Sequence, residues 1–145
     1  SRPGAAWGKS PVEERNRRSV YIYVKRSLHE PFLSAFDWAD TDNTCDVRFV
    51  TTVPTQTLTL LNSKFLNDSA ESLAKRLAKA VPGDSKAQVT RALRLATSRK
   101  PTGEEVDDGL ELIHGLKAEA KLSDSEALQR FCLLVLNLNE FLYLD

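Results

Sequence analysis

The side chains best suited to binding a ligand gather near the start of the chain, where basic residues flank two tyrosines. The cluster comprises Arg15, Arg17, Arg18, Tyr21, Tyr23, Lys25 and Arg26. Guanidinium groups bind carboxylate, sulfate or phosphate through paired hydrogen bonds, and tyrosine rings stack on sugars or on packing surfaces. Three interpretations follow: ion pairs with the acidic loop that begins at Asp37, an anion or glycan site, or a docking surface for another domain. The first, a purely structural role, is the favoured interpretation.

The element that would position this cluster is a short strand. Ser19 to Val24 (SVYIYV) is rich in β-branched and aromatic residues, which is typical of strands. Alternation along a strand places Tyr21 and Tyr23 on one face with Arg17 and Lys25. A second strand is predicted over Val47 to Val53, ending before Pro54.

Other patterns that could carry chemistry are weak. The two histidines, His29 and His114, stand 85 positions apart. The loop from Asp37 to Asp46 offers several carboxylates, but it lacks the glycine and the terminal glutamate of an EF-hand loop, so a solvated loop is favoured over a calcium site. No phosphate-binding glycine loop or nucleophile motif is present. We therefore predict no metal site, name no catalytic residue, and expect no complete active site within these 145 residues.

Two cysteines, Cys45 and Cys132, match no metal-binding or haem-attachment spacing. A disulfide between them is one alternative in an oxidising compartment. Two separate thiols, at least one of them buried, is the favoured alternative.

The charges are balanced overall, with 20 basic and 20 acidic side chains, but they are unevenly distributed. Residues 1–30 carry seven basic and three acidic side chains, whereas residues 101–145 carry three basic and ten acidic. Nucleic-acid binders usually carry a basic excess, so nucleic acid is an unfavoured partner. The longest strictly apolar run, Phe131 to Leu136, is far too short to cross a bilayer, and we expect no membrane insertion.

Helix signals dominate from Thr55 onward. Thr55 is a predicted N-cap for a helix with Leu58, Leu61 and Phe65 on one face. Four predicted capping boxes follow, each ahead of an apolar stripe: Asp68 with Glu71, Ser85 with Gln88, Thr102 with Glu105, and Ser123 with Glu126. The last of these helices is apolar on most faces and is expected to be central, with a break near Asn137 and Asn139.

These elements predict a mainly α fold: a bundle of about five to six helices with a short N-terminal strand or two-stranded element. Residues 1–17 are expected to form a linker or extended arm, and residues 18–145 a single mainly helical domain. Methionine is absent, which leads us to expect a fragment or a processed chain.

Three separated motifs, at 17–27 (RRSVYIYVKRS), 49–66 (FVTTVPTQTLTLLNSKFL) and 134–145 (LVLNLNEFLYLD), resemble those of a known family. The chain is similar to the planctomycete-type, PSD-type C-terminal domain of unknown function that occurs in large proteins with a cytochrome c module. The resemblance spans about residues 16 to 145. It implies that this is the C-terminal part of a large exported bacterial protein, located outside the cytoplasm, with its haem c in another module and no cofactor in this domain.

The family's polar motif positions suggest a ligand-binding or interdomain site. The candidate residues are Arg17, Arg18, Tyr21, Arg26, Asp37, Arg48 and Gln56. The favoured hypothesis is a non-catalytic accessory or interaction domain that packs against neighbouring domains of the same polypeptide and aids polysaccharide binding. The alternative is half of an enzyme site, completed by the preceding domain for redox or carbohydrate chemistry. A closed, paired polar network favours the first hypothesis, and an open cleft with unpaired polar groups favours the second.

Overall fold

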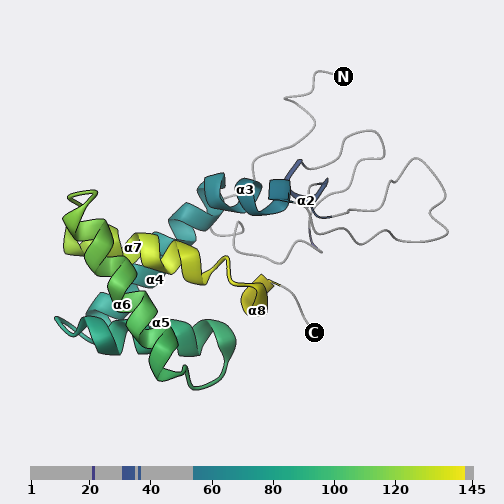
Figure 1. Cartoon of the computed structure of the whole chain (residues 1–145). Helices are drawn as coiled ribbons and strands as arrows, with labels where there is room; N and C mark the ends of the chain where they lie inside the picture. The colour runs from purple at the N-terminus through teal and green to yellow at the C-terminus, as the bar shows by residue number, and fades with distance from the viewer. Residues whose placement is uncertain (1–20, 22–30, 35, 37–53, 143–145) are drawn as a thin grey trace, which may run out of the picture. The chain divides into compact units, whose positions relative to one another are not determined.

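A computed structural model describes Tyr21, residues 31–34, Phe36 and residues 54–142 of the chain (Figure 1). Backbone contacts divide the chain into two units, Ser1–Val50 and Thr51–Asp145. In the first unit, helix α2 spans Pro31–Ser34. Tyr21, the one described residue of the predicted strand at 19–24, is not in a strand. The predicted strand at 47–53 and the predicted arm at 1–17 lie outside the described residues.

The second unit is built from helices. They are α3 (Pro54–Asn62), α4 (Lys64–Ala80), α5 (Ser85–Thr97), α6 (Gly103–Ala118), α7 (Asp124–Val135) and α8 (Asn139–Leu142). The described residues contain no strand. The predicted mainly helical fold is therefore confirmed, whereas the predicted two-stranded element is not shown.

Helix α7 lies at the centre of this unit, as its apolar sequence predicted. It packs against α4, α5 and α6, and α4 provides its most extensive contact (Figure 1). Phe131, Cys132 and Val135 on α7 are almost completely buried, as is Leu77 on α4. Burial of such side chains on both helices supplies the main stabilisation of a small helical domain.

Two of the four predicted capping boxes are present. The Thr102 amide donates to Glu105 Oε2 at 2.7 Å, and the Glu105 amide donates to Thr102 Oγ1 at 3.2 Å. Ser123 and Glu126 make the same reciprocal pair at the start of α7. Each box satisfies backbone N–H groups that have no partner inside the helix, so these two helix starts were predictable from sequence.

The predicted box at Ser85 is wrong by one residue. Asp84 is the N-cap of α5, and its Oδ1 accepts from the Ala87 amide at 2.9 Å. Gln88, the expected second member, is buried and donates from Nε2 to the Val81 carbonyl at 2.7 Å. This bond occupies a carbonyl at the end of α4, where no helical N–H is available.

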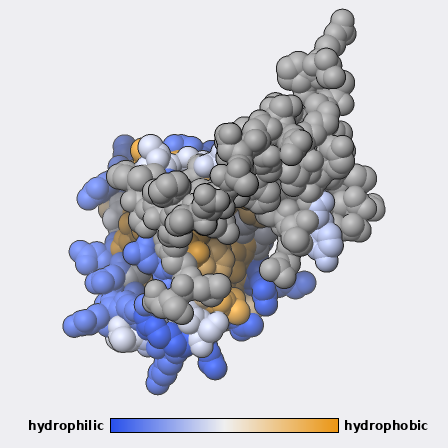
Figure 2. Space-filling view, turned by 90° about the vertical axis from the view of Figure 1, so that its right-hand side faces the viewer, coloured by the Kyte–Doolittle hydropathy of each residue, from blue (hydrophilic) through white to orange (hydrophobic). Residues whose placement is uncertain are grey.

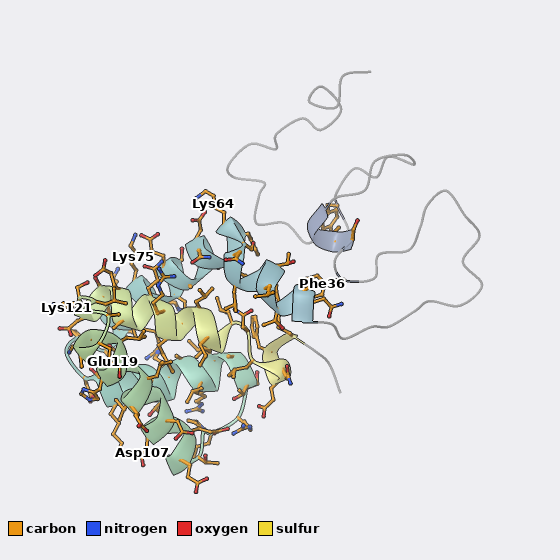
Figure 3. The ribbon with its side chains drawn as sticks, turned by 45° about the horizontal axis from the view of Figure 1, so that its top comes forward. Phe36, Lys64, Lys75, Asp107, Glu119 and Lys121 are labelled. Atoms are coloured by element: carbon orange, nitrogen blue, oxygen red, sulfur yellow. The ribbon has the colours of Figure 1, made fainter. Side chains whose placement is uncertain are left out.

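The predicted box at Asp68 is also wrong, because α4 begins at Lys64 and runs through Asp68 and Glu71. Both carboxylates pair with a lysine one turn away: Asp68 with Lys64 at 2.9 Å, and Glu71 with Lys75. Such pairs on an exposed helix face stabilise the helix slightly. The lysines lie on the outer side of α4 (Figure 3).

A glycine allows a close approach of three helices. A Cβ at Gly109 of α6 would lie 2.8 Å from Val89 Cγ1 of α5 and 2.9 Å from Phe131 Cε2 of α7. At Gly115, six residues further along α6, a Cβ would have no neighbour within 4 Å. Gly109 is therefore required where three helices meet.

The predicted break near the C-terminus is confirmed. Helix α7 ends at Val135, and α8 begins at Asn139. Asn137 Nδ2 donates to the Leu133 carbonyl at 2.7 Å, which satisfies one of the last carbonyls of α7. None of the helices in the described residues has the length and apolar content needed to cross a membrane.

Candidate functional site

Most of the predicted site residues lie outside the described part of the chain. These are Arg17, Arg18, Arg26, Asp37 and Arg48. Tyr21 is described and is 72% exposed, whereas Gln56 on α3 is only 2% exposed and has an interaction partner. A buried, partnered glutamine fits a closed polar network at this one position. Whether the arginines join such a network stays a prediction.

A group of apolar side chains is exposed where α3 meets α4. Leu58 is 57% exposed, Leu61 37% and Phe65 60%. We call these three residues the junction patch. Apolar surface also lies open between hydrophilic side chains in the space-filling view (Figure 2). Contiguous exposed apolar surface on a domain commonly marks a contact with another protein surface.

The junction patch differs from the predicted apolar face. Leu58, Leu61 and Phe65 were predicted on one face of a single helix, but α3 ends at Asn62 and Phe65 lies on α4. The side chains that α3 buries are Gln56 and Leu60. The predicted N-cap at Thr55 is wrong as well, since α3 begins at Pro54 and Thr55 lies inside it. Spacing identifies an apolar face but does not show what covers it.

Hydrogen bonds from one asparagine fix the geometry of the junction. Ser63 has extended backbone dihedrals between the two helices, and its side chain makes no capping bond. Asn67 Nδ2 donates to the Leu61 carbonyl at 3.0 Å and to the Ser63 carbonyl at 2.9 Å. The first bond satisfies a carbonyl in the last turn of α3, and the second reaches the Ser63 carbonyl, which also accepts from the Asn67 amide at the start of α4. The two helices are therefore joined by a defined bend.

A second feature is an open pocket of about 530 Å³ between α5, α6, α7 and the turn into α8. We call it the four-helix pocket. Its apolar wall includes Leu112, Leu134 and Leu138, and its polar rim includes Arg99, Glu105 and Glu140. The pocket was not predicted from the sequence, because its lining comes from segments up to 47 positions apart, from Leu93 to Glu140.

On the rim of the four-helix pocket, Arg99 binds two carboxylates that come from different helices. Its Nη1 and Nη2 donate to the two carboxylate oxygens of Glu105 at 2.9 and 2.6 Å. Its Nε and Nη2 donate to the carboxylate of Glu140 on α8 at 3.2 and 3.0 Å. The Arg99 guanidinium and the Thr102 amide together lower the pKa of Glu105 to about 2, so this carboxylate is ionised at neutral pH.

Two acceptors in the pocket lining remain without a donor in the described part of the chain. The Asp108 carboxylate is exposed and has no hydrogen bond or ion pair. Asn137 Oδ1 is buried and has no hydrogen-bond partner, which typically costs about 1–3 kcal/mol. With one arginine against three carboxylates, the formal charge of the lining is −2.

The remaining chemically interesting group is the buried thiol of Cys132. It is free, and desolvation raises its pKa to about 12. A thiol in this environment is protonated and unreactive at neutral pH. Cys45 lies outside the described residues. Among the described residues, no group of three or more His, Cys, Asp or Glu side chains is placed to hold a metal ion.

Comparison with known proteins gives one family. The family model of PSD1, described as a protein of unknown function (DUF1553), matches residues 1–113. No curated protein and no solved structure matches the chain. The match includes the first two motifs noted in the sequence, at 17–27 and 49–66, while the closing run at 134–145 lies beyond it. Because the match covers well over half of the 145 residues, the chain belongs to the PSD1 (DUF1553) family of proteins of unknown function.

Proposed function

We propose that this chain is a non-catalytic accessory domain that packs against a neighbouring domain of a large, exported, haem-linked bacterial protein. The observation that carries this proposal is the junction patch. Leu58, Leu61 and Phe65 are between about one third and three fifths exposed in a helical unit that has a buried apolar core.

The size of the patch favours a partner on the same polypeptide. Complete burial of a Leu or Phe side chain contributes roughly 1.5–3 kcal/mol, so covering the exposed part of three such side chains contributes roughly 2–5 kcal/mol. Two free proteins lose about 4–15 kcal/mol of translational and rotational freedom when they associate. A tethered domain is already present at millimolar effective concentration. The patch is therefore suited to docking within one chain.

The chemistry around the patch defines the surface that would cover it. Helix α3 contains no charged side chain, and the nearest charges on α4, Lys64 and Asp68, neutralise each other. We propose that the occupant is an uncharged apolar face of the adjacent domain. A charged face would lose its hydration without gaining an ion partner.

We propose polysaccharide as the ligand class for the predicted N-terminal site. The exposed ring of Tyr21 supports this, because an aromatic face open to solvent offers a stacking surface for a sugar. The five predicted polar partners of Tyr21 that lie outside the described residues are Arg17, Arg18, Arg26, Asp37 and Arg48. Thermal melting with neutral and sulfated oligosaccharides tests the polysaccharide proposal. We expect an oligosaccharide to raise the melting temperature of the chain, and we expect Arg18→Ala to abolish this rise.

The docking proposal is tested by hydrogen exchange at 54–66, measured in the full-length polypeptide and in the 145-residue chain alone. We expect stronger protection in the full-length protein. The double variant Leu58→Ser, Phe65→Ser should remove the difference while changing the melting of the isolated chain little, since exposed substitutions usually cost about 0.5 kcal/mol or less.

Leu95→Ser provides the matched control, because Leu95 is an exposed leucine on α5 away from the junction. It should leave the extra protection intact. Equal protection of 54–66 in the two proteins, or an equal loss of protection in the Leu95 variant, would contradict docking at the junction patch.

A further inference from the structure

We propose that the four-helix pocket binds a small organic cation: a protonated amine carried on an apolar body. This inference concerns a different surface from the junction patch and does not depend on the proposed docking function. It rests on the size of the pocket, the apolar character of its wall and the charge of its rim.

The shape of the pocket fits a small molecule. Its volume of about 530 Å³ lies within the range of about 300–1,000 Å³ that is usual for ligand sites. The apolar wall combines Leu112 of α6, Leu134 of α7 and Leu138 of the following turn. Leu134 is 48% exposed, so a bound apolar group would remove surface from water there.

The charge of the rim determines which sign of charge a ligand in this pocket should carry. Arg99 is the one cation in the described lining, and it donates to both oxygens of Glu105 and both oxygens of Glu140. An incoming anion would have to displace a carboxylate from Arg99 and would enter a lining with a formal charge of −2. The geometry therefore disfavours anions.

The free carboxylate in the lining favours a cationic donor. The Asp108 carboxylate is exposed on the α6 side of the pocket and is not engaged by Arg99. Asn137 Oδ1 also lacks a donor, but this atom is buried and is not open to a ligand in the pocket. An ammonium group carries three N–H donors and one positive charge, so it complements the Asp108 carboxylate. A neutral alcohol offers one donor and no charge.

Three probes of similar size test the choice of charge. They are 2-phenylethylammonium, 2-phenylethanol and 3-phenylpropanoate, titrated into the isotope-labelled chain at neutral pH and low salt with two-dimensional NMR. We expect the ammonium compound to bind at least fivefold more tightly than either of the others, with shifts concentrated at the pocket residues of α6 and the α7–α8 turn.

A matched pair of variants tests the role of the free carboxylate. Asp108→Asn should weaken binding of the ammonium probe roughly three- to fivefold, as expected for an exposed ion pair, and leave binding of the alcohol unchanged. Asp107→Asn is the control, since Asp107 is an exposed neighbour on α6 that does not line the pocket (Figure 3). It should change the affinity less than twofold.

A third variant tests the apolar wall. Leu134→Ala should weaken binding of the ammonium and alcohol probes by a similar factor, because it removes apolar contact without changing charge. Because Leu134 and Asp108 are exposed, both variants should remain folded, which the NMR spectra report directly. Equal affinity for the three probes, no shifts at millimolar ammonium compound, or equal losses in the Asp107 and Asp108 variants would each overturn the proposal.

Discussion

Around Gly109, helices α5, α6 and α7 approach so closely that there is no room for a Cβ atom, whereas at the α3–α4 junction three large apolar side chains stay open to solvent. Both regions have apolar residues at helical spacing. In the first, the helices on either side of α6 in the sequence, α5 and α7, supply the covering surfaces. In the second, α3 buries Gln56 and Leu60, and the described helices leave the junction patch open to solvent.

This difference separates residues that hold the fold together from residues available for contact. Substitutions around Gly109 should lower the stability of the isolated chain. Substitutions in the junction patch should leave that stability nearly unchanged.

Leu77→Ala should destabilise the chain by about 2–5 kcal/mol, because Leu77 is completely buried in the contact between α4 and the rest of the unit. Leu58→Ala should change the free energy of unfolding by no more than about 0.5 kcal/mol, because Leu58 is exposed. Urea unfolding of both variants measures the contrast. Similar losses in the two variants would mean that the junction patch is part of the core.

Gly109→Ala should destabilise the chain by about 1–3 kcal/mol, because its Cβ must displace Val89 or Phe131. Gly115→Ala on the same helix should stabilise it by about 0.5–1 kcal/mol, since alanine has the higher helix propensity and the site is open. Thermal unfolding should therefore shift in opposite directions for the two variants. A shift in the same direction would contradict close packing at Gly109.

Thr102→Ala should cost about 0.5–2 kcal/mol, because it removes the side-chain acceptor of the α6 capping box. Ser63→Ala should have a much smaller effect, because the Ser63 side chain makes no capping bond at the start of α4. Chemical denaturation of the two variants compares a capped helix start with the junction. A larger loss for Ser63→Ala would show that the bend depends on the serine hydroxyl.

The stability of the chain should fall as the pH drops from about 4.5 towards 2, partly because of Glu105. Its pKa in the folded protein, about 2, is lower than its ordinary value of 4.5, so the unfolded chain binds the proton first and folding weakens with acidification. Glu105→Gln should flatten this part of the pH profile. Glu104→Gln should not, because Glu104 is exposed and has no ion pair among the described residues. Unfolding free energies at several pH values test the comparison.

The mainly helical fold and two of its helix starts could be predicted from the sequence. Thr102 with Glu105 and Ser123 with Glu126 each have their partners within three residues, so local spacing is sufficient to predict the capping boxes. The pair Asp68 and Glu71 has the same spacing, but Lys64 and Lys75 bind these carboxylates inside a continuous helix. Local spacing does not reveal which of the two arrangements is more stable.

The family, the helical periodicity and the central position of α7 could be predicted from the sequence alone, because each rests on patterns that are readable within short segments of the chain. Only the tertiary structure shows that Leu58, Leu61 and Phe65 are exposed and that Arg99, already paired with Glu105, also binds Glu140, 41 positions further along the chain. It also shows that Gly109 lies where three helices meet. Burial and long-range ion pairing depend on which surfaces meet after folding, and periodicity along one helix does not specify its partner.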